Sequence, residues 1–285
     1  MGMNFNIKKF NMNMIRERCD LDSRKAPMIV LIGKRDTGKS FLVRDILANC
    51  REAFPIGTVI SGSEVASPFF QDLVPSKLIH DKYNPQIVMN SIKRQMAVKQ
   101  ARNNEMRNGG HSNTDPRAFL ILDDCLYDKT WMNEESTRYV FMNGRHIDLA
   151  TLITMQYPLG VPPNLRTNID FVFILRENVL GNRKRIYDNY AGMFPTFQMF
   201  CQFMDQCTEN YECLVVCNGI QSNRLEDQVF WYKASEHPPF KMCDQSLWID
   251  NKQFSSSFLA QDEYDPNKVR KKNSDPWVKV KKTEK

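Results

Sequence analysis

The residues best suited to chemistry stand in one run, Gly33-Lys-Arg-Asp-Thr-Gly-Lys-Ser40. This run fits the pattern G-x-x-x-x-G-K-[ST] in full. Its glycines let backbone N–H groups turn inward around phosphate oxygens, and a following helix adds the positive end of its dipole. The final lysine and serine add a mobile positive charge and a hydroxyl ligand for Mg²⁺. The pattern therefore predicts a loop that binds nucleotide phosphates.

The sequence around this loop supports the prediction. An apolar run typical of a strand comes before it and a stretch typical of a helix follows it, which disfavours a glycine turn without a ligand. We expect Lys39 to reach the β- and γ-phosphates and Ser40 to bind Mg²⁺. The predicted nucleotide-binding residues are Gly33, Lys34, Arg35, Asp36, Thr37, Gly38, Lys39, Ser40 and Phe41.

Two carboxylates, Asp123 and Asp124, follow the apolar run 118–122. Mg²⁺ takes oxygen ligands, and a hydrolytic water needs a base. We therefore predict that Asp123 holds the metal through its water shell and that Asp124 orients and deprotonates the attacking water. Aspartates that only cap a turn are the alternative, but the phosphate loop upstream favours the catalytic interpretation. A second acid directly after the first is typical of NTPases that hydrolyse their nucleotide.

Polar residues also flank the apolar run 149–155. Gln156 follows it, at a position from which a polar side chain can sense the γ-phosphate and touch the attacking water; a buried or capping glutamine is the alternative. Arg145 precedes it and could act on a neighbouring subunit's γ-phosphate as an arginine finger. An ordinary surface arginine is the alternative there, and Arg166 and Arg176 are rival fingers.

Short apolar runs indicate the elements that must position these residues. Buried strands are expected at residues 28–32, 56–61, 118–122, 149–155 and 171–175. Helices are expected at 41–49 and 84–108. Apolar strands that alternate with helices are typical of an α/β fold whose mainly parallel sheet is covered on both faces. Beyond residue 195 we expect a short helix and an antiparallel edge hairpin of strands 212–217 and 229–233.

The net charge of +6 lies in the C-terminal tail. Residues 268–285 contain eight basic and two acidic side chains, whereas residues 1–267 contain 31 of each. A basic tail suits a polyanion but also serves as a solubilising terminus, and charge leaves both open. The helix expected at 84–108 is the second basic segment. The nucleic-acid candidates are Arg102, Arg107, Arg270, Lys271, Lys272, Lys279, Lys281 and Lys282.

The composition limits the class of protein. With 42% hydrophobic and 25% charged residues, wholesale disorder, collagen and coiled coil are excluded. No apolar run approaches the ~18 residues of a membrane helix, and the N-terminus lacks the apolar segment of a secretory signal. The eight cysteines have no C-x-x-C spacing, which indicates reduced, mostly buried thiols. We expect an extension at 1–26, an ATPase domain at 27–260 and a flexible basic tail at 261–285.

The order of GKRDTGKS, FLILDD, NGRH and a strand ending in Gln156 resembles the FtsK–HerA superfamily of P-loop motors. Within it, the chain looks like the poxvirus-type DNA-packaging ATPases of large nucleocytoplasmic DNA viruses. The resemblance covers roughly residues 27–235. It implies a RecA-like P-loop fold that uses ATP and Mg²⁺, with Asp123 on the metal, Asp124 as base, Gln156 as sensor and Arg145 as finger in trans. The loop interior, 34–37, departs from the commoner glycine and serine filling.

The same resemblance implies partners and a location. It implies a homo-oligomeric ring of about five or six subunits that threads double-stranded DNA into a capsid, with portal or vertex proteins as partners. The host cytoplasm, at the viral factory, is the implied location, with the virion as a second one. Two alternatives stay open. A P-loop nucleotide or nucleoside kinase would grip a second substrate with Arg183, Lys184 and Arg185 but leaves the acidic pair unexplained. A nucleotide-gated DNA-binding scaffold would turn over little ATP.

Overall fold

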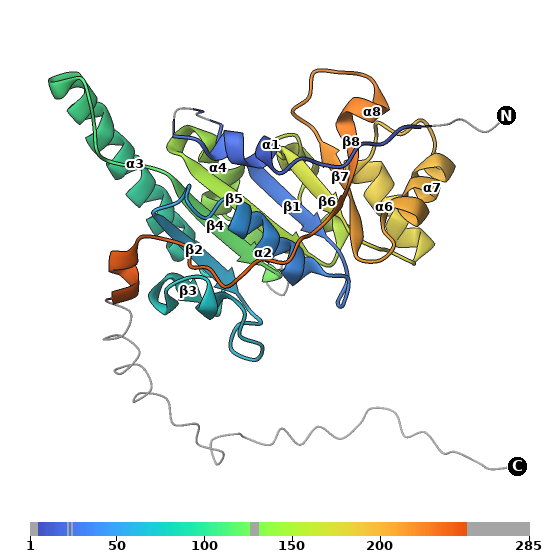
Figure 1. Cartoon of the computed structure of the whole chain (residues 1–285), viewed down its shortest axis with the longest axis horizontal. Helices are drawn as coiled ribbons and strands as arrows, with labels where there is room; N and C mark the ends of the chain where they lie inside the picture. Colours follow the sequence, from blue (N-terminus) through green and yellow to red (C-terminus); the bar gives the residue numbers. More distant parts are fainter. Residues whose placement is uncertain (1–4, 22, 24, 126–130, 250–285) are drawn as a thin grey trace, which may run out of the picture.

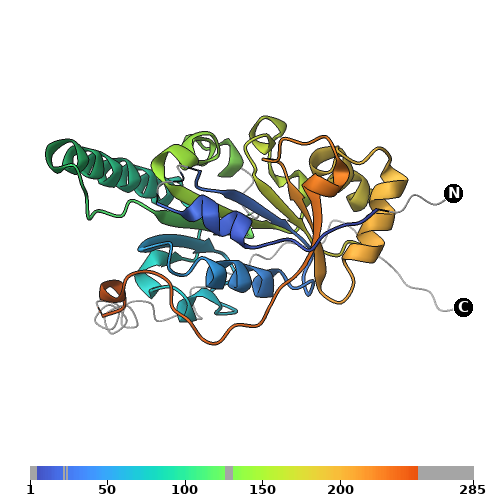
Figure 2. The ribbon, with the colours of Figure 1, turned by 45° about the horizontal axis from the view of Figure 1, so that its top comes forward.

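A twisted sheet of eight strands forms the centre of the molecule, with helices on both faces (Figures 1 and 2). The structure is a computed structural model that describes residues 5–21, 23, 25–125 and 131–249. Side chains of β1 alternate between two apolar cores, with Val30 and Ile32 on one face and Ile29 and Leu31 on the other. The sheet is thus buried on both faces, as the uninterrupted apolar strands predict.

The sheet is parallel except at its C-terminal side. The strands are β1 Met28–Ile32, β2 Ile56–Ser61, β3 Ile79–His80, β4 Ala118–Asp123, β5 Leu149–Met155, β6 Phe171–Ile174, β7 Glu212–Cys217 and β8 Val229–Lys233. Their spatial order is β3-β2-β4-β5-β1-β6-β7-β8. β7 runs antiparallel to both β6 and β8, so the predicted edge hairpin is confirmed. This order places β5 between the strand before the phosphate loop and the strand before the acidic pair.

The helices alternate with the parallel strands. They are α1 Asn13–Arg16, α2 Lys39–Asn49, α3 Pro85–Gly109, α4 Glu135–Asn143, α5 Pro163–Arg166, α6 Leu180–Tyr190, α7 Phe197–Cys207 and α8 Leu225–Gln228. The start of α3 follows from local chemistry: the Asn84 side chain accepts a 2.8 Å hydrogen bond from the Gln86 N–H, and proline fills the first helical position. Gly110, with φ +72°, ends it in the left-handed conformation that favours glycine.

The second half of α3 projects away from the body (Figure 1). Its buried residues, Val88, Ile92 and Gln95, all lie in the first half. Met96 is 42% exposed. The helix therefore continues beyond the sheet on which it packs.

The N-terminal segment covers the β8 edge of the sheet. The Phe10 N–H donates to the Trp231 carbonyl at 2.8 Å, and the Trp231 N–H donates to the Lys8 carbonyl at 3.1 Å. Phe10 and Ile15 are buried in the core. The described part of residues 1–26 therefore packs on the sheet. The limits of the ATPase domain, 27–260, stay a prediction, and the tail 261–285 lies outside the described residues.

Residues 234–249 form a C-terminal strap that leads from β8 across α2 to the other side of the sheet (Figure 1). The Met242 N–H donates to the Leu73 carbonyl at 2.8 Å, and the Asp244 N–H donates to the Pro55 carbonyl at 2.9 Å. Before these contacts, Ala234 and Glu236 of the strap line a cavity together with Gly38, which ends the loop between β1 and α2.

All eight cysteines are free thiols, and most are buried, as expected. No helix within the described ranges has the length and apolar character that crossing a membrane requires.

Candidate active site

The predicted phosphate loop connects β1 to α2. It starts at Gly33, whose N–H donates to the Met155 carbonyl at 3.0 Å, and it closes at Gly38, which has φ +94°. A Cβ on Gly33 would lie 2.7 Å from the Thr37 hydroxyl oxygen and 2.9 Å from the Leu175 Cβ. Both positions therefore require glycine, one for space and one for backbone conformation.

Lys39 is folded back along this loop. Its ammonium donates to the carbonyl oxygens of Gly33 at 2.5 Å and Lys34 at 3.0 Å. Burial lowers its pKa, and the carboxylates of Asp124 and Asp123 oppose that shift. The ammonium thus lies between the loop and the acidic pair. At the start of α2, Ser40 is exposed and the Phe41 side chain is 42% exposed.

Asp123 is held by hydroxyl groups from both neighbouring strands. Ser61 at the end of β2 donates to one carboxylate oxygen at 2.7 Å, and Thr154 on β5 donates to the other at 2.6 Å. Both residues are buried. A carboxylate and the Ser40 hydroxyl are hard oxygen donors, so the residues present fit Mg²⁺. Ser61 and Thr154 were not predicted as site residues, although polar residues near the ends of apolar strands were a signal for them.

Asp124 and Gln156 lie together beside this acid. Asp124 has φ +50°, and its N–H donates to the Thr154 hydroxyl at 3.1 Å. The Gln156 amide donates to the Asp124 carboxylate. Because β5 lies between β4 and β1, Gln156 stands between the acidic pair and the phosphate loop. The structure therefore gathers Lys39, Asp123, Asp124 and Gln156 at one edge of the sheet.

A buried glutamate supports the interior of the loop. Glu177 pairs with the Lys34 ammonium at 2.5 Å and accepts from the Val179 N–H at 2.7 Å and the Asn182 amide at 3.0 Å. Burial alone would raise the pKa of Glu177, but these partners outweigh it and lower that pKa. Lys34 is thus paired within the protein. No sequence pattern indicated this contact between distant segments.

The candidate arginines lie at different edges. Arg145 is exposed in the 3₁₀ turn Gly144–Ile147 before β5. Its positive charge opposes the rise in pKa that burial gives Asp170, and the Asp170 N–H donates to the Met28 carbonyl at the start of β1. The structure therefore does not bring Arg145 to its own phosphate loop. Arg166 donates to the Val161 carbonyl at 2.7 Å. Arg176 is exposed directly after β6, at the edge that carries the loop.

The nucleic-acid candidates are only partly described. Arg102 lies on the projecting half of α3, where its guanidinium donates to the Thr114 carbonyl at 2.8 Å. Arg107 is exposed near the end of the same helix. The tail candidates lie outside the described residues; they are Arg270, Lys271, Lys272, Lys279, Lys281 and Lys282.

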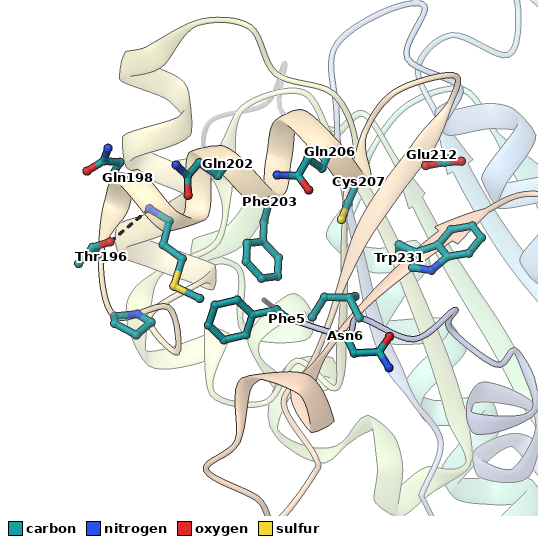
Figure 3. A pocket seen from close by; sticks show the side chains of 13 residues that line it. Phe5, Asn6, Thr196, Gln198, Gln202, Phe203, Gln206, Cys207, Glu212 and Trp231 are labelled. Atoms are coloured by element: carbon teal, nitrogen blue, oxygen red, sulfur yellow. Dashed lines mark hydrogen bonds between the residues drawn. The ribbon is translucent and has the colours of Figure 1, made fainter. Parts of the chain in front are cut away.

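Two cavities differ in their relation to this site. One of about 940 Å³ lies between the N-terminal segment, α7 and β8, where Phe5 and Phe203 face each other below a row of glutamines on α7 (Figure 3). None of the predicted site residues lines it. The other, of about 460 Å³, opens directly beside Gly38 and Phe41. The larger of the two cavities is therefore not the one beside the predicted active site.

The sheet order and the site together define a P-loop NTPase fold, and a solved structure shares it. The superposition on the pCW3 conjugation coupling protein TcpA, solved with ATPγS, covers 82% of this chain and 66% of TcpA, with a TM-score of 0.51 and 14% identity. The superposition on B204, the DNA-packaging ATPase from Sulfolobus turreted icosahedral virus, covers 74% of this chain and 100% of B204, with a TM-score of 0.48 and 14% identity. The likeness to TcpA shows a shared fold only, and the fold assignment does not rest on B204.

Sequence relatives define the family. "Uncharacterized protein 088R" of Invertebrate iridescent virus 3 is 40% identical over 206 residues, which is 72% of this chain and 75% of the relative. "Uncharacterized protein L437" of Acanthamoeba polyphaga mimivirus is 37% identical over 211 residues, which is 74% of this chain and 73% of the relative. The chain belongs to this family of large DNA virus proteins. No protein-family model matches it.

Proposed function

We propose that the chain is an ATP-hydrolysing motor that translocates double-stranded DNA and packages a viral genome into its capsid. The observation that carries the enzymatic part is the placement of Asp124 and Gln156 in direct contact, beside Lys39 and on the strand ends next to the phosphate loop. A loop that only binds nucleotide needs neither a carboxylate nor an amide at that place.

Each side chain has a part in hydrolysis. The backbone N–H groups of residues 33–38 and the Lys39 ammonium bind and neutralise the phosphates. Asp124 accepts a proton from the attacking water, and Gln156 orients the Asp124 carboxylate and the water. Ser40 and Asp123 would hold Mg²⁺, which supplies charge neutralisation on the β- and γ-phosphates when bound. Ser61 and Thr154 keep the Asp123 carboxylate in one orientation.

Two observations support the motor and the packaging role. The motif order in this chain resembles that of viral DNA-packaging ATPases, and the family that contains it comes from large DNA viruses. The exposed Arg145 lies away from its own loop, which suits a finger supplied to a neighbouring subunit in a ring. A ring of about five or six subunits, docking on a capsid portal or vertex at the viral factory, is the assembly that we propose.

Phosphate release, measured with and without duplex DNA, tests the proposal. A motor hydrolyses ATP and is stimulated by DNA. A kinase needs a nucleotide or nucleoside acceptor for turnover, and a scaffold binds ATP and DNA with little turnover. Either of those results would overturn the proposed function. Mass measurement with a non-hydrolysable ATP analogue then gives the number of subunits, and a strictly monomeric protein would contradict the ring.

A further inference from the structure

The cavity beside the phosphate loop lies on the side opposite the acidic pair. It is formed by the start of α2, Leu175 after β6, Tyr211 before β7, and the strap residues Ala234 and Glu236. In the sheet, β6, β7 and β8 lie on one side of β1, whereas β5 and β4 lie on the other. A nucleotide whose terminal phosphate faces Asp124 therefore directs its other end toward this cavity.

Tyr211 is held at the mouth of the cavity by an unfavourable backbone conformation. Asn210 and Tyr211 have φ +49° and +63°, and a bulky residue in this left-handed region is an outlier that costs conformational energy. The turn is closed by the Glu212 N–H, which donates to the Glu209 carbonyl at 2.8 Å. Yet the Tyr211 side chain is 72% exposed, so burial of the ring does not offset the cost. Strain of this kind gathers at ligand sites.

The ring of Tyr211 packs against the loop itself. A Cβ on Gly38 would lie 3.4 Å from its Cδ1 atom, so the ring stands over the last residue of the phosphate loop. Phe41, in the first turn of α2, adds a second exposed aromatic side chain to the same cavity. Two aromatic surfaces thus flank an apolar space next to a phosphate site.

We propose that this cavity holds the nucleobase of the bound ATP, with the base stacked on Tyr211 and in contact with Phe41. The inference rests on the proposed function, because that function places the phosphates on the loop. Stacking on an aromatic ring is a general means of holding a base. Lys233 and Glu236 stand at the exposed rim, where an ammonium and a carboxylate can meet the polar edge of the base.

Two probes separate base recognition from phosphate recognition: Mg-ATP, and Mg-tripolyphosphate, which lacks base and ribose. Stacking contributes about 1–3 kcal/mol per base, and ~1.4 kcal/mol is a tenfold change in affinity. Tyr211→Ala should therefore weaken ATP binding by about tenfold while leaving tripolyphosphate binding unchanged. Tyr211→Phe keeps the ring and should bind ATP as the parent does. Phe41→Leu should weaken ATP binding less than Tyr211→Ala. Phe5→Ala, which removes an aromatic ring from the distant cavity at α7, is the matched control.

Each result bears on the inference. Equal loss of both ligands in Tyr211→Ala, with the fold intact by circular dichroism, would mean that the ring only shapes the loop, and would overturn it. So would unchanged ATP affinity in Tyr211→Ala and Phe41→Leu. Retained tripolyphosphate binding shows that a variant is folded, which covers the case of a damaged protein. Lys39→Ala should lose both ligands; if it loses neither, the phosphate site and the proposed function fail instead.

Discussion

The Thr154 hydroxyl donates a 2.6 Å hydrogen bond to Asp123 and accepts a 3.1 Å hydrogen bond from the Asp124 N–H. One side chain of β5 thus orients both acids at the end of β4. Removing a group that orients a metal ligand lowers metal affinity by roughly 10–100-fold. Thr154→Val keeps the shape and should raise the Mg²⁺ concentration for half-maximal ATP hydrolysis about tenfold. Thr154→Ser, which keeps the hydroxyl, is the control. An unchanged Mg²⁺ titration for Thr154→Val would contradict the assignment of Asp123 as a ligand of the metal.

Asp124→Asn should separate binding from turnover. Asparagine also tolerates the positive φ at this position, so the backbone is retained while the base is lost. Turnover should fall by about 10² or more, with the dissociation constant for ATP unchanged. Single-turnover phosphate release and nucleotide titration measure the two quantities. Asp72→Asn, at an exposed acid elsewhere, should behave as the parent. Normal hydrolysis by Asp124→Asn would show that Asp124 is not the base.

Mixed rings test Arg145. Arg145→Ala should bind ATP yet fail to hydrolyse it, because the finger is missing at every subunit boundary. Mixing it with Lys39→Ala protein should restore partial activity, since an intact Arg145 then faces an intact loop. Arg166→Ala and Arg176→Ala, tested in the same way, are the comparison variants. Lack of rescue in rings shown by mass measurement to be mixed would exclude Arg145.

The segment that binds DNA can be identified from the salt dependence of the DNA affinity. Each phosphate contact contributes about −0.9 to the slope of log affinity against log salt. Deleting 268–285 should flatten that slope equally for all duplex sequences and leave basal ATP hydrolysis unchanged. The alternative DNA-binding segment is the projecting half of α3. If the deletion leaves the slope intact while Arg102→Ala with Arg107→Ala flattens it, α3 holds the DNA and the tail is only a solubilising terminus.

The ion pair of Glu177 with Lys34 should give a pH-dependent stability. The partners of Glu177 hold its pKa in the folded protein below the ordinary value of a glutamate. Its contribution to stability is therefore complete above that ordinary value and is lost as the pH falls through the lower folded pKa. Glu177→Gln should lower the free energy of unfolding at pH 7 by about 1–2 kcal/mol, and the difference should shrink in acid. Urea unfolding at a series of pH values measures it; a difference independent of pH would contradict the assignment. Glu52→Gln, at an exposed glutamate, is the control.

The strands and the acidic edge could be predicted from sequence because they depend on local pattern. The apolar runs 28–32, 56–61 and 149–155 coincide with β1, β2 and β5. The carboxyl ends of neighbouring parallel strands meet at one edge of a sheet, so Asp123 and Gln156 had to approach each other. β3, with only two residues, carries no such pattern.

Contacts that depend on which loops meet could not be predicted. Lys34 contacts Glu177, and Gly38 contacts Tyr211, only because β6 lies next to β1 in the sheet and β7 lies next to β6. The strained Asn210–Tyr211 turn has no glycine to mark it. Periodicity also does not show where a helix leaves the body of the protein, as α3 does in its second half.

The two ends of the sheet limit how copies of this chain can associate. At one end the hydrogen-bonding groups of Trp231 are already taken by Lys8 and Phe10, and at the other end β3 offers only Ile79 and His80. Among the residues that the structure describes, neither end presents a long open ladder to a second backbone. In the ring that we propose, copies of the chain would therefore meet through side chains of the described part rather than through a continuous sheet. Contacts of that kind could slide and re-form at each step of a motor without breaking a strand pair.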